Sequence, residues 1–355
     1  MGQFSVPAST KLSSGSFTPP STRESTSAPS DRNSTLYPPQ RSSLLEDYRI
    51  HKLGRRWELE DITGYLVEFS TDQHGSRFVQ QKIEAAGPEE KQKIYDELMP
   101  YAYELMQDVF GNYVVQKMFE LGDPEQKTAL ADKMRGNVLP LSMQMYGCRV
   151  VQKALEHVTT EQRAEIVAEL EPHFVECLRS SNANHVIQRL ITLDPPQSLS
   201  SAFLGHFQEL ATNPFGCRVI QKMIEQLGDD MKRQILDEMH PISAMLMQDQ
   251  FGNYVIQSVI TVGSEEDRQK VVDRLKGQML NMSRHKFASN VCERAMQHAR
   301  PEDRRSLIDE LINMQPDGST HIPMLLRDAF GNFPLQVSWL RSTLANNSDR
   351  IAMRR

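Results

Sequence analysis

Hydrophobic and polar positions repeat along this chain with a long, nearly fixed period. A seven-residue segment occurs eight times after Leu44. Its last residue is Gln80, Gln116, Gln152, Gln188, Gln221, Gln257, Glu293 and Gln336. The spacings between these residues are 36, 36, 36, 33, 36, 36 and 43 residues. Such a period with helical patterning predicts a solenoid, in which each unit buries its apolar face only against its neighbours.

Each segment predicts a helix with one polar and one apolar face. In the second unit, Asn112, Tyr113 and Gln116 fall within about 100° of arc on a helix that turns 100° per residue. Val114 and Met118 fall on the opposite side. This division is typical of a helix that packs on a core through one stripe.

A second helical stretch lies between successive segments. Residues 88–98 and 301–311 both begin with Pro and continue with acidic residues, which are signals of a helix N-terminus. We therefore expect two helices per unit and an all-α fold.

The chain divides into three parts by composition. Residues 1–42 are rich in Ser, Thr and Pro and have few large apolar side chains, so they cannot offset the entropy cost of ordering and are predicted to be a disordered tail. Residues 43–337 form the predicted repeat domain, and residues 338–355 form an atypical C-terminal tail. The 33-residue spacing, at Asp194-Pro-Pro196, predicts one shortened helix that leaves the neighbouring segment intact.

Composition restricts the function classes. No apolar run approaches 18 residues and the N-terminus lacks a secretory signal, so we expect a soluble intracellular protein without a membrane span. Cys148, Cys177, Cys217 and Cys292 show no metal-ligand or disulfide spacing, so reduced thiols and no bound metal are expected. The net charge of −6 argues mildly against nucleic-acid binding.

The polar positions of the segments use few residue types. We name the residue after the small Gly or Ala position i. Position i is only Ser, Asn or Cys, position i+4 is Gln seven times and Glu once, and position i+1 is Arg, Tyr, His, Asn or Phe. Amides offer a donor and an acceptor to the edge of an unpaired base, and flat side chains can stack on it. A solvated helix face has no need for this restriction.

These positions are the candidate RNA-contacting residues. The candidates for base edges are Ser76, Gln80, Asn112, Gln116, Cys148, Gln152, Asn184, Gln188, Cys217, Gln221, Asn253, Gln257, Ser289, Glu293, Asn332 and Gln336. The candidates for base stacking are Arg77, Tyr113, Arg149, His185, Arg218, Tyr254, Asn290 and Phe333.

The eight segments, over about residues 44–337, resemble the Pumilio (PUF) repeats of sequence-specific RNA-binding proteins, in which each repeat reads one base. The stretch from Leu44-Leu-Glu-Asp-Tyr48 through Trp57-Glu-Leu59 resembles the half-repeat that caps the N-terminal end of that family. The resemblance implies a right-handed α-solenoid, a curved superhelix of eight repeats. It also implies a monomeric cytoplasmic regulator that binds 3′ untranslated regions of mRNA and lowers translation or mRNA stability. Deadenylase or translational-repressor proteins are the protein partners it implies, and no cofactor is implied.

The family's code implies a base for each set of side chains. Ser or Cys with Arg and Gln, in repeats one, three and five, implies adenine, and Asn with Tyr or His and Gln, in repeats two, four and six, implies uracil. Ser289 with Glu293 implies guanine, and this assignment has chemistry of its own, because guanine offers two adjacent N–H donors and a carboxylate only accepts. Since RNA runs antiparallel to the protein in this family, the implied site is UGUAUAUA.

Charge is expected to be separated between the two faces of the solenoid. A basic residue directly follows position i+4 in five repeats: Lys117, Lys153, Arg189, Lys222 and Arg294. These residues fall at about 140° from position i, while acids concentrate in the second helices. We expect a basic inner strip that binds phosphate despite the net negative charge.

The last unit departs from the family's pattern. Phe333 and Pro334 stand where Tyr and Val are usual, and proline disfavours helical geometry in the residue before it. Only 19 residues follow Gln336, and they do not resemble the family's closing half-repeat. The eighth set of side chains is therefore the weakest part of the resemblance.

Two other functions compete with RNA recognition. A protein-binding α-solenoid of the HEAT or armadillo type shares the helices and the period, but it gives no reason for Asn-Tyr-Gln and Cys-Arg-Gln to alternate on one face. No catalytic motif or metal-spaced ligand set is present, so no enzymatic activity is expected.

Overall fold

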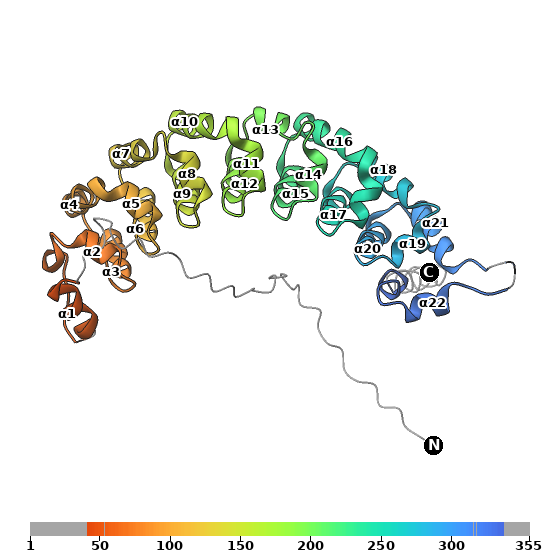
Figure 1. Cartoon of the computed structure of the whole chain (residues 1–355), viewed down its shortest axis with the longest axis horizontal. Coiled ribbons are helices and arrows are strands. Elements are labelled where there is room, and N and C mark those ends of the chain that lie inside the picture. Colours follow the sequence, from red (N-terminus) through yellow and green to blue (C-terminus); the bar gives the residue numbers. More distant parts are fainter. Residues whose placement is uncertain (1–40, 53, 315, 317, 337–355) are drawn as a thin grey trace, which may run out of the picture.

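The computed structural model describes residues 41–52, 54–314, 316 and 318–336, and these residues form a curved row of helices (Figure 1). The predicted disordered tail lies outside the described residues except for its last two, and the predicted C-terminal tail lies outside them entirely. A single antiparallel bridge, between Met314 and Thr320, accompanies the helices of the described part. No helix in these ranges is long and apolar enough to cross a membrane.

Repeats one to seven are each built from three helical segments, so the prediction of two was wrong for them. In repeat two they are the short helix α5 (Ala102–Gln107), the inner helix α6 (Gly111–Leu121) and the outer helix α7 (Pro124–Met134). The short helix has only about one and a half turns, too few to show a helical period in the sequence. The stretch predicted upstream of each segment is the outer helix, and it ends the preceding repeat.

The same order recurs along the chain. The short helices are α2 (Leu66–Ser70), α5, α8 (Val138–Met143), α11 (Phe174–Arg179), α14 (Phe207–Ala211), α19 (Met279–Ser283) and α22 (Ile322–Arg327). The inner helices are α3 (Gly75–Ala85), α6, α9 (Gly147–His157), α12 (Ala183–Leu193), α15 (Gly216–Gln226), α17 (Gly252–Val262) and α20 (Ala288–His298). The outer helices are α4 (Pro88–Leu98), α7, α10 (Thr160–Leu170), α13 (Ser198–Ser201), α16 (Asp229–Gln248), α18 (Glu265–Leu275) and α21 (Pro301–Ile312). Figure 1 shows the inner helices along the concave side and the outer helices along the convex side.

Two repeats vary this plan. The outer helix of repeat four is reduced to α13, four residues long, as the 33-residue spacing predicts. Between repeats five and six, the outer and short helices join into α16, which has Pro241 inside it. The inner helices keep their length of 11 residues at both places, so the concave side is unaffected.

A continuous apolar core runs through the row. Val114, Val115 and Met118 of α6 are fully buried, which confirms the apolar stripe predicted for this helix. The small residue before position i lets the inner helix approach the short helix closely. A Cβ atom on Gly147 would lie 2.5 Å from the carbonyl oxygen of Leu141, too near for ordinary contact.

The N-terminal end is covered by α1 (Ser43–His51) and the stretch that follows it. Tyr48 packs against Trp57, Phe69 and Phe78, with ring centroids 5.2–5.3 Å apart. Leu45 and Leu59 are also buried. The stretch that resembles a capping half-repeat therefore covers the apolar side of repeat one that would otherwise face solvent.

At the other end, repeat eight contains α22 and helical residues 332–336. Pro334 lies in the first turn of this helix, where backbone N–H groups have no intrahelical acceptor. The proline is therefore compatible with helical geometry at this position.

Candidate nucleic-acid interface

The predicted residues lie in the first two turns of the inner helices, and these helices line the concave side (Figure 1). In repeats one to seven, position i is at most 4% exposed, position i+4 is half-buried and position i+1 is exposed. The structure thus brings all three positions of each repeat to one face. Position i lies deepest, and position i+1 projects furthest from the helix.

In repeats two, four and six the two amides form a hydrogen-bonded pair. Asn112 Nδ2 donates to the carbonyl oxygens of Asp108, at 2.8 Å, and Val109, at 3.0 Å, and its Oδ1 accepts from Gln116 Nε2 at 2.9 Å. The corresponding Gln–Asn distances in repeats four and six are both 2.8 Å. Because the Asn donors are already used, the pair presents the Gln carbonyl oxygen and one remaining N–H to the concave side.

In repeats one, three and five the Gln is held by the main chain instead. Gln80, Gln152 and Gln221 each donate to the carbonyl oxygen of their own position i, at 3.1, 2.9 and 3.0 Å. Burial raises the pKa of the Cys217 thiol to about 11 and also raises the pKa of Cys148. Both thiols are therefore protonated at neutral pH and act as small, weakly polar groups.

Repeat seven has a network that the sequence pattern did not predict. Gln297 Nε2 donates to Glu293 Oε1 at 3.1 Å, and Gln297 Oε1 accepts from Arg294 at 3.3 Å. Gln297 stands two turns after position i, at about 80° of arc and hence on the same face. Examining position i+8 in every repeat would have found it.

The stacking candidates form an exposed row. Arg149 Nη1 donates to the hydroxyl oxygen of Tyr113 at 3.2 Å, so neighbouring repeats already contact one another through this row. Burial lowers the pKa of His185, and the positive charges of Arg218 and Arg149 lower it further. His185 is therefore a neutral, flat ring between two guanidinium groups at neutral pH.

In every repeat but the third, a side chain four residues before position i fixes the start of the inner helix, a feature that the sequence pattern did not predict. Asp108 Oδ1 accepts from the backbone N–H of Phe110 at 2.8 Å and of Gly111 at 2.6 Å. Equivalent pairs of bonds are made by Asp72, Ser180, Asn213, Asp249, His285 and Asp328. Capping residues satisfy helix N–H groups in this way, and their recurrence four residues ahead was a readable signal.

The predicted basic strip is only partly free. Lys117 pairs with Glu84, at 2.7 Å, and Glu120, at 3.1 Å. Glu156 pairs with Lys153 at 3.0 Å and with Arg189 at 3.2 Å. Three members of the predicted strip, Lys117, Lys153 and Arg189, are therefore paired with carboxylates on the same edge, and phosphate binding by the strip stays a prediction.

Repeat eight lacks the amide pair of repeats two, four and six. Asn332 Oδ1 is buried without a hydrogen-bond partner among the described residues, and Gln336 is exposed. Phe333 is 53% exposed, as a stacking residue would be. The sequence alone could not show that the same two amides fail to meet here.

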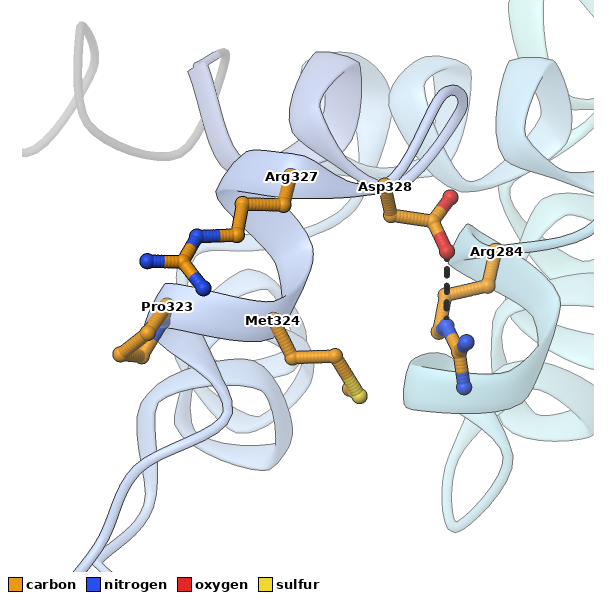
Figure 2. Close-up of a pocket in the computed structure, with 5 residues that line it drawn as sticks. All are labelled: Arg284, Pro323, Met324, Arg327 and Asp328. Atoms are coloured by element: carbon orange, nitrogen blue, oxygen red, sulfur yellow. Dashed lines mark hydrogen bonds and ion pairs between the residues drawn. The ribbon is translucent and has the colours of Figure 1, made fainter.

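A cavity of about 470 Å³ opens between repeats seven and eight (Figure 2). It is lined by Arg284, Pro323, Met324, Arg327 and Asp328, and Arg284 Nε lies 2.8 Å from Asp328 Oδ2. The backbone N–H of Gly331 and the guanidinium of Arg284 lower the pKa of Asp328 to about 2. Asp328 is therefore ionised at neutral pH while it caps the last inner helix.

Within the ranges that the structure covers, no group of three or more His, Cys, Asp or Glu side chains could hold a metal ion. The fold and the concave polar row define a class of protein: an α-solenoid of three-helix repeats that presents one set of polar side chains per repeat.

Comparison with known proteins identifies the family. The model of the Pumilio-family RNA binding repeat matches residues 65–99, 101–134, 137–171, 206–240, 244–276 and 278–312. The chain therefore belongs to the Pumilio family. The two units without a match are repeat four, with its reduced outer helix, and repeat eight.

Curated relatives and solved structures agree with this assignment. Pumilio homolog 3 of Arabidopsis thaliana is 52% identical over 58 residues, which is 16% of this chain and 6% of the relative. Pumilio homolog 1 of Xenopus laevis is 44% identical over 91 residues, 26% of this chain and 8% of the relative. The matched stretches thus span less than a tenth of the length of these relatives.

Among solved structures, the Puf3 RNA binding domain bound to Cox17 RNA 3′ UTR recognition sequence site A has a TM-score of 0.77 and 36% identity. The alignment covers 83% of this chain and 90% of that one. PUF-8 in complex with PBE-RNA has a TM-score of 0.78 and 32% identity, with 83% and 88% covered.

Proposed function

We propose that the concave side binds single-stranded RNA in a sequence-specific manner, one base per repeat. The observation that carries this proposal is the recurrence of a fixed amide edge. In six consecutive repeats a Gln is held by a hydrogen bond to position i, at 2.8–3.1 Å. Side chains held in place before binding lose little entropy when a ligand arrives.

The choice of base follows from what accompanies the Gln. An amide oxygen with one N–H matches the edge of uracil and that of adenine alike, because each edge offers one donor beside one acceptor. Position i then distinguishes the two, since Asn fills more of the face than Ser or Cys does. Glu293 offers only acceptors and suits the two donors of guanine. With the family's antiparallel orientation, the proposed site is UGUAUAUA.

The cellular role is proposed from the relatives. Puf3 and Puf4 RNA binding domains are described as bound to 3′ UTR recognition sequences. We propose that this protein likewise binds 3′ untranslated regions of mRNA in the cytoplasm and lowers translation or mRNA stability by recruiting deadenylase or repressor proteins. A monomer that needs no cofactor and performs no catalysis is sufficient for this role.

Fluorescence anisotropy with labelled RNA tests the binding. We expect tight binding of UGUAUAUA and weaker binding of its reversed sequence AUAUAUGU, which has the same composition and charge. A duplex of UGUAUAUA should bind poorly because its base edges are already paired. Selection from a random RNA pool then reads all eight positions at once. Equal affinity for the two single strands would exclude base-specific recognition.

A further inference from the structure

A second row of polar residues runs along the concave side, at position i+8 of the inner helices. At 100° per residue this position falls at about 80° from position i, between positions i+4 and i+1. Its residues are Glu84, Glu120, Glu156, Thr192, Glu225, Thr261 and Gln297. Four carboxylates therefore stand on the face that is proposed to bind a polyanion, where unpaired negative charge would oppose binding.

The carboxylates of repeats one to three hold the basic residues at position i+5 of repeats two to four. Glu84 pairs with Lys117 of the next repeat at 2.7 Å, and Glu156 pairs with Arg189 of the next repeat at 3.2 Å. The hydrogen bond to Glu84 raises the pKa of Lys117, and the bond from Lys117 lowers the pKa of Glu120. The side chain of Lys117 is only 19% exposed. These cations are already neutralised before any RNA arrives.

The later repeats lack this arrangement. Lys222 of repeat five follows a repeat with Thr192 at i+8, and Arg294 of repeat seven follows a repeat with Thr261. Over the described part of the chain, neither Lys222 nor Arg294 has a carboxylate within ion-pair distance. Glu225, at i+8 of repeat five, has no cation to hold in the next repeat, because position i+5 of repeat six is the uncharged Ser258. The two halves of the concave side therefore differ in the free positive charge at position i+5.

We propose that Glu84, Glu120 and Glu156 hold the cations of repeats two to four away from the RNA backbone, so that phosphate attraction is concentrated on repeats five to seven. A phosphate must compete with a carboxylate for each paired cation, and a cation that is already neutralised adds little to the release of counterions from RNA. The inference rests on the proposed RNA binding. It assigns the 5′ half of the site to both charge and base contacts, and the 3′ half mainly to base contacts.

Two matched substitutions test the role of the carboxylates. Glu156→Gln and Glu225→Gln each remove one charge at i+8, but only Glu156 holds cations, Lys153 and Arg189. From the slope of about 0.7 per phosphate contact on single strands, Glu156→Gln should steepen the log–log dependence of affinity on salt by about 0.7, because one carboxylate neutralises one unit of positive charge. Glu225→Gln should change that slope by less than half as much. Equal changes would show that general repulsion alone is at work and would overturn the proposal.

A second pair tests the cations themselves. Lys222→Gln should lower the salt slope by about 0.7, because it removes a free cation. Arg189→Gln, at the same position one repeat earlier, should leave the slope nearly unchanged, because Glu156 already neutralises that charge. Equal losses would also overturn the proposal. If the unmodified chain did not bind UGUAUAUA at all, the proposed function itself would fail. Thermal unfolding by circular dichroism confirms that each variant is folded.

Discussion

Repeats six and eight carry the same two amides in different surroundings. In repeat six, Asn253 is buried, its Nδ2 donates to two backbone carbonyls, and Gln257 donates to its Oδ1 at 2.8 Å. In repeat eight, Asn332 Oδ1 is buried without a partner in the described ranges and Gln336 is exposed. Inner helix α17 of repeat six packs between α15 and α20, whereas no described helix follows repeat eight. The comparison indicates that the residue types alone do not place the amide pair.

The largest expected effect comes from removing the two amides of repeat six, compared with removing the two amides of repeat eight. Asn253→Ala with Gln257→Ala should weaken binding to UGUAUAUA by about 1–3 kcal/mol, the range of one good bidentate base contact on DNA. Asn332→Ala with Gln336→Ala should cost clearly less, because that pair is not formed beforehand. Anisotropy titrations of both variants on the same RNA measure the difference. Equal losses would show that RNA orders repeat eight as fully as repeat six.

A double substitution in repeat seven tests whether the two amides determine the base when the inner helix that carries them is packed against another inner helix. Ser289→Asn with Glu293→Gln installs the amides of repeat six in a repeat whose inner helix α20 packs against α17. We expect preference at the second base to move from guanine to uracil, by about 1–3 kcal/mol on the same scale. Competition binding with the two RNAs measures the preference. Retained guanine preference would contradict the proposed role of Glu293.

The capping carboxylates give a smaller effect, on stability. Asp249→Ala removes the acceptor for the N–H groups of Phe251 and Gly252 at the start of α17 and should cost roughly 0.5–2 kcal/mol of unfolding free energy. Faster hydrogen exchange in α17 than in α9 would show the loss.

The cap of repeat eight adds a pH dependence. The pKa of Asp328 is about 2 in the fold, below its ordinary value, so its ionised form is stabilised by folding. This contribution is fully present above the ordinary pKa of Asp and disappears as the pH falls through about 2. Hydrogen exchange in repeat eight should increase over that acidic range, and Asp328→Asn should remove most of the change.

The repeats, their inner helices and the row of polar positions could be predicted from sequence because each depends on local spacing. Residues such as Asn112, Tyr113 and Gln116 reach one face through helix geometry alone. The short helices are too short to show a helical period in the sequence. The ion pair between Lys117 and Glu84 joins two residues of different repeats that are 33 positions apart in sequence. Contacts between repeats depend on how closely the units stack. The residue types do not reveal the different placement of Asn332 and Gln336, because repeat six carries the same two amides.

The smallest expected effect tests whether Pro334 is the reason that repeat eight differs from repeat six. If Pro334 disturbs the helix, Pro334→Val should restore the amide pair and raise the preference for uracil at the first base. The position of Pro334 in the first helical turn argues against this, because no backbone hydrogen bond is lost there. Replacing a compatible proline should instead lower stability by roughly 0.4–1 kcal/mol, since the unfolded chain gains freedom. We therefore expect the preference at the first base to stay within about twofold, below 0.5 kcal/mol. Competition titrations that substitute only the first base decide the question, and a preference approaching that of repeat six would identify the proline as the cause.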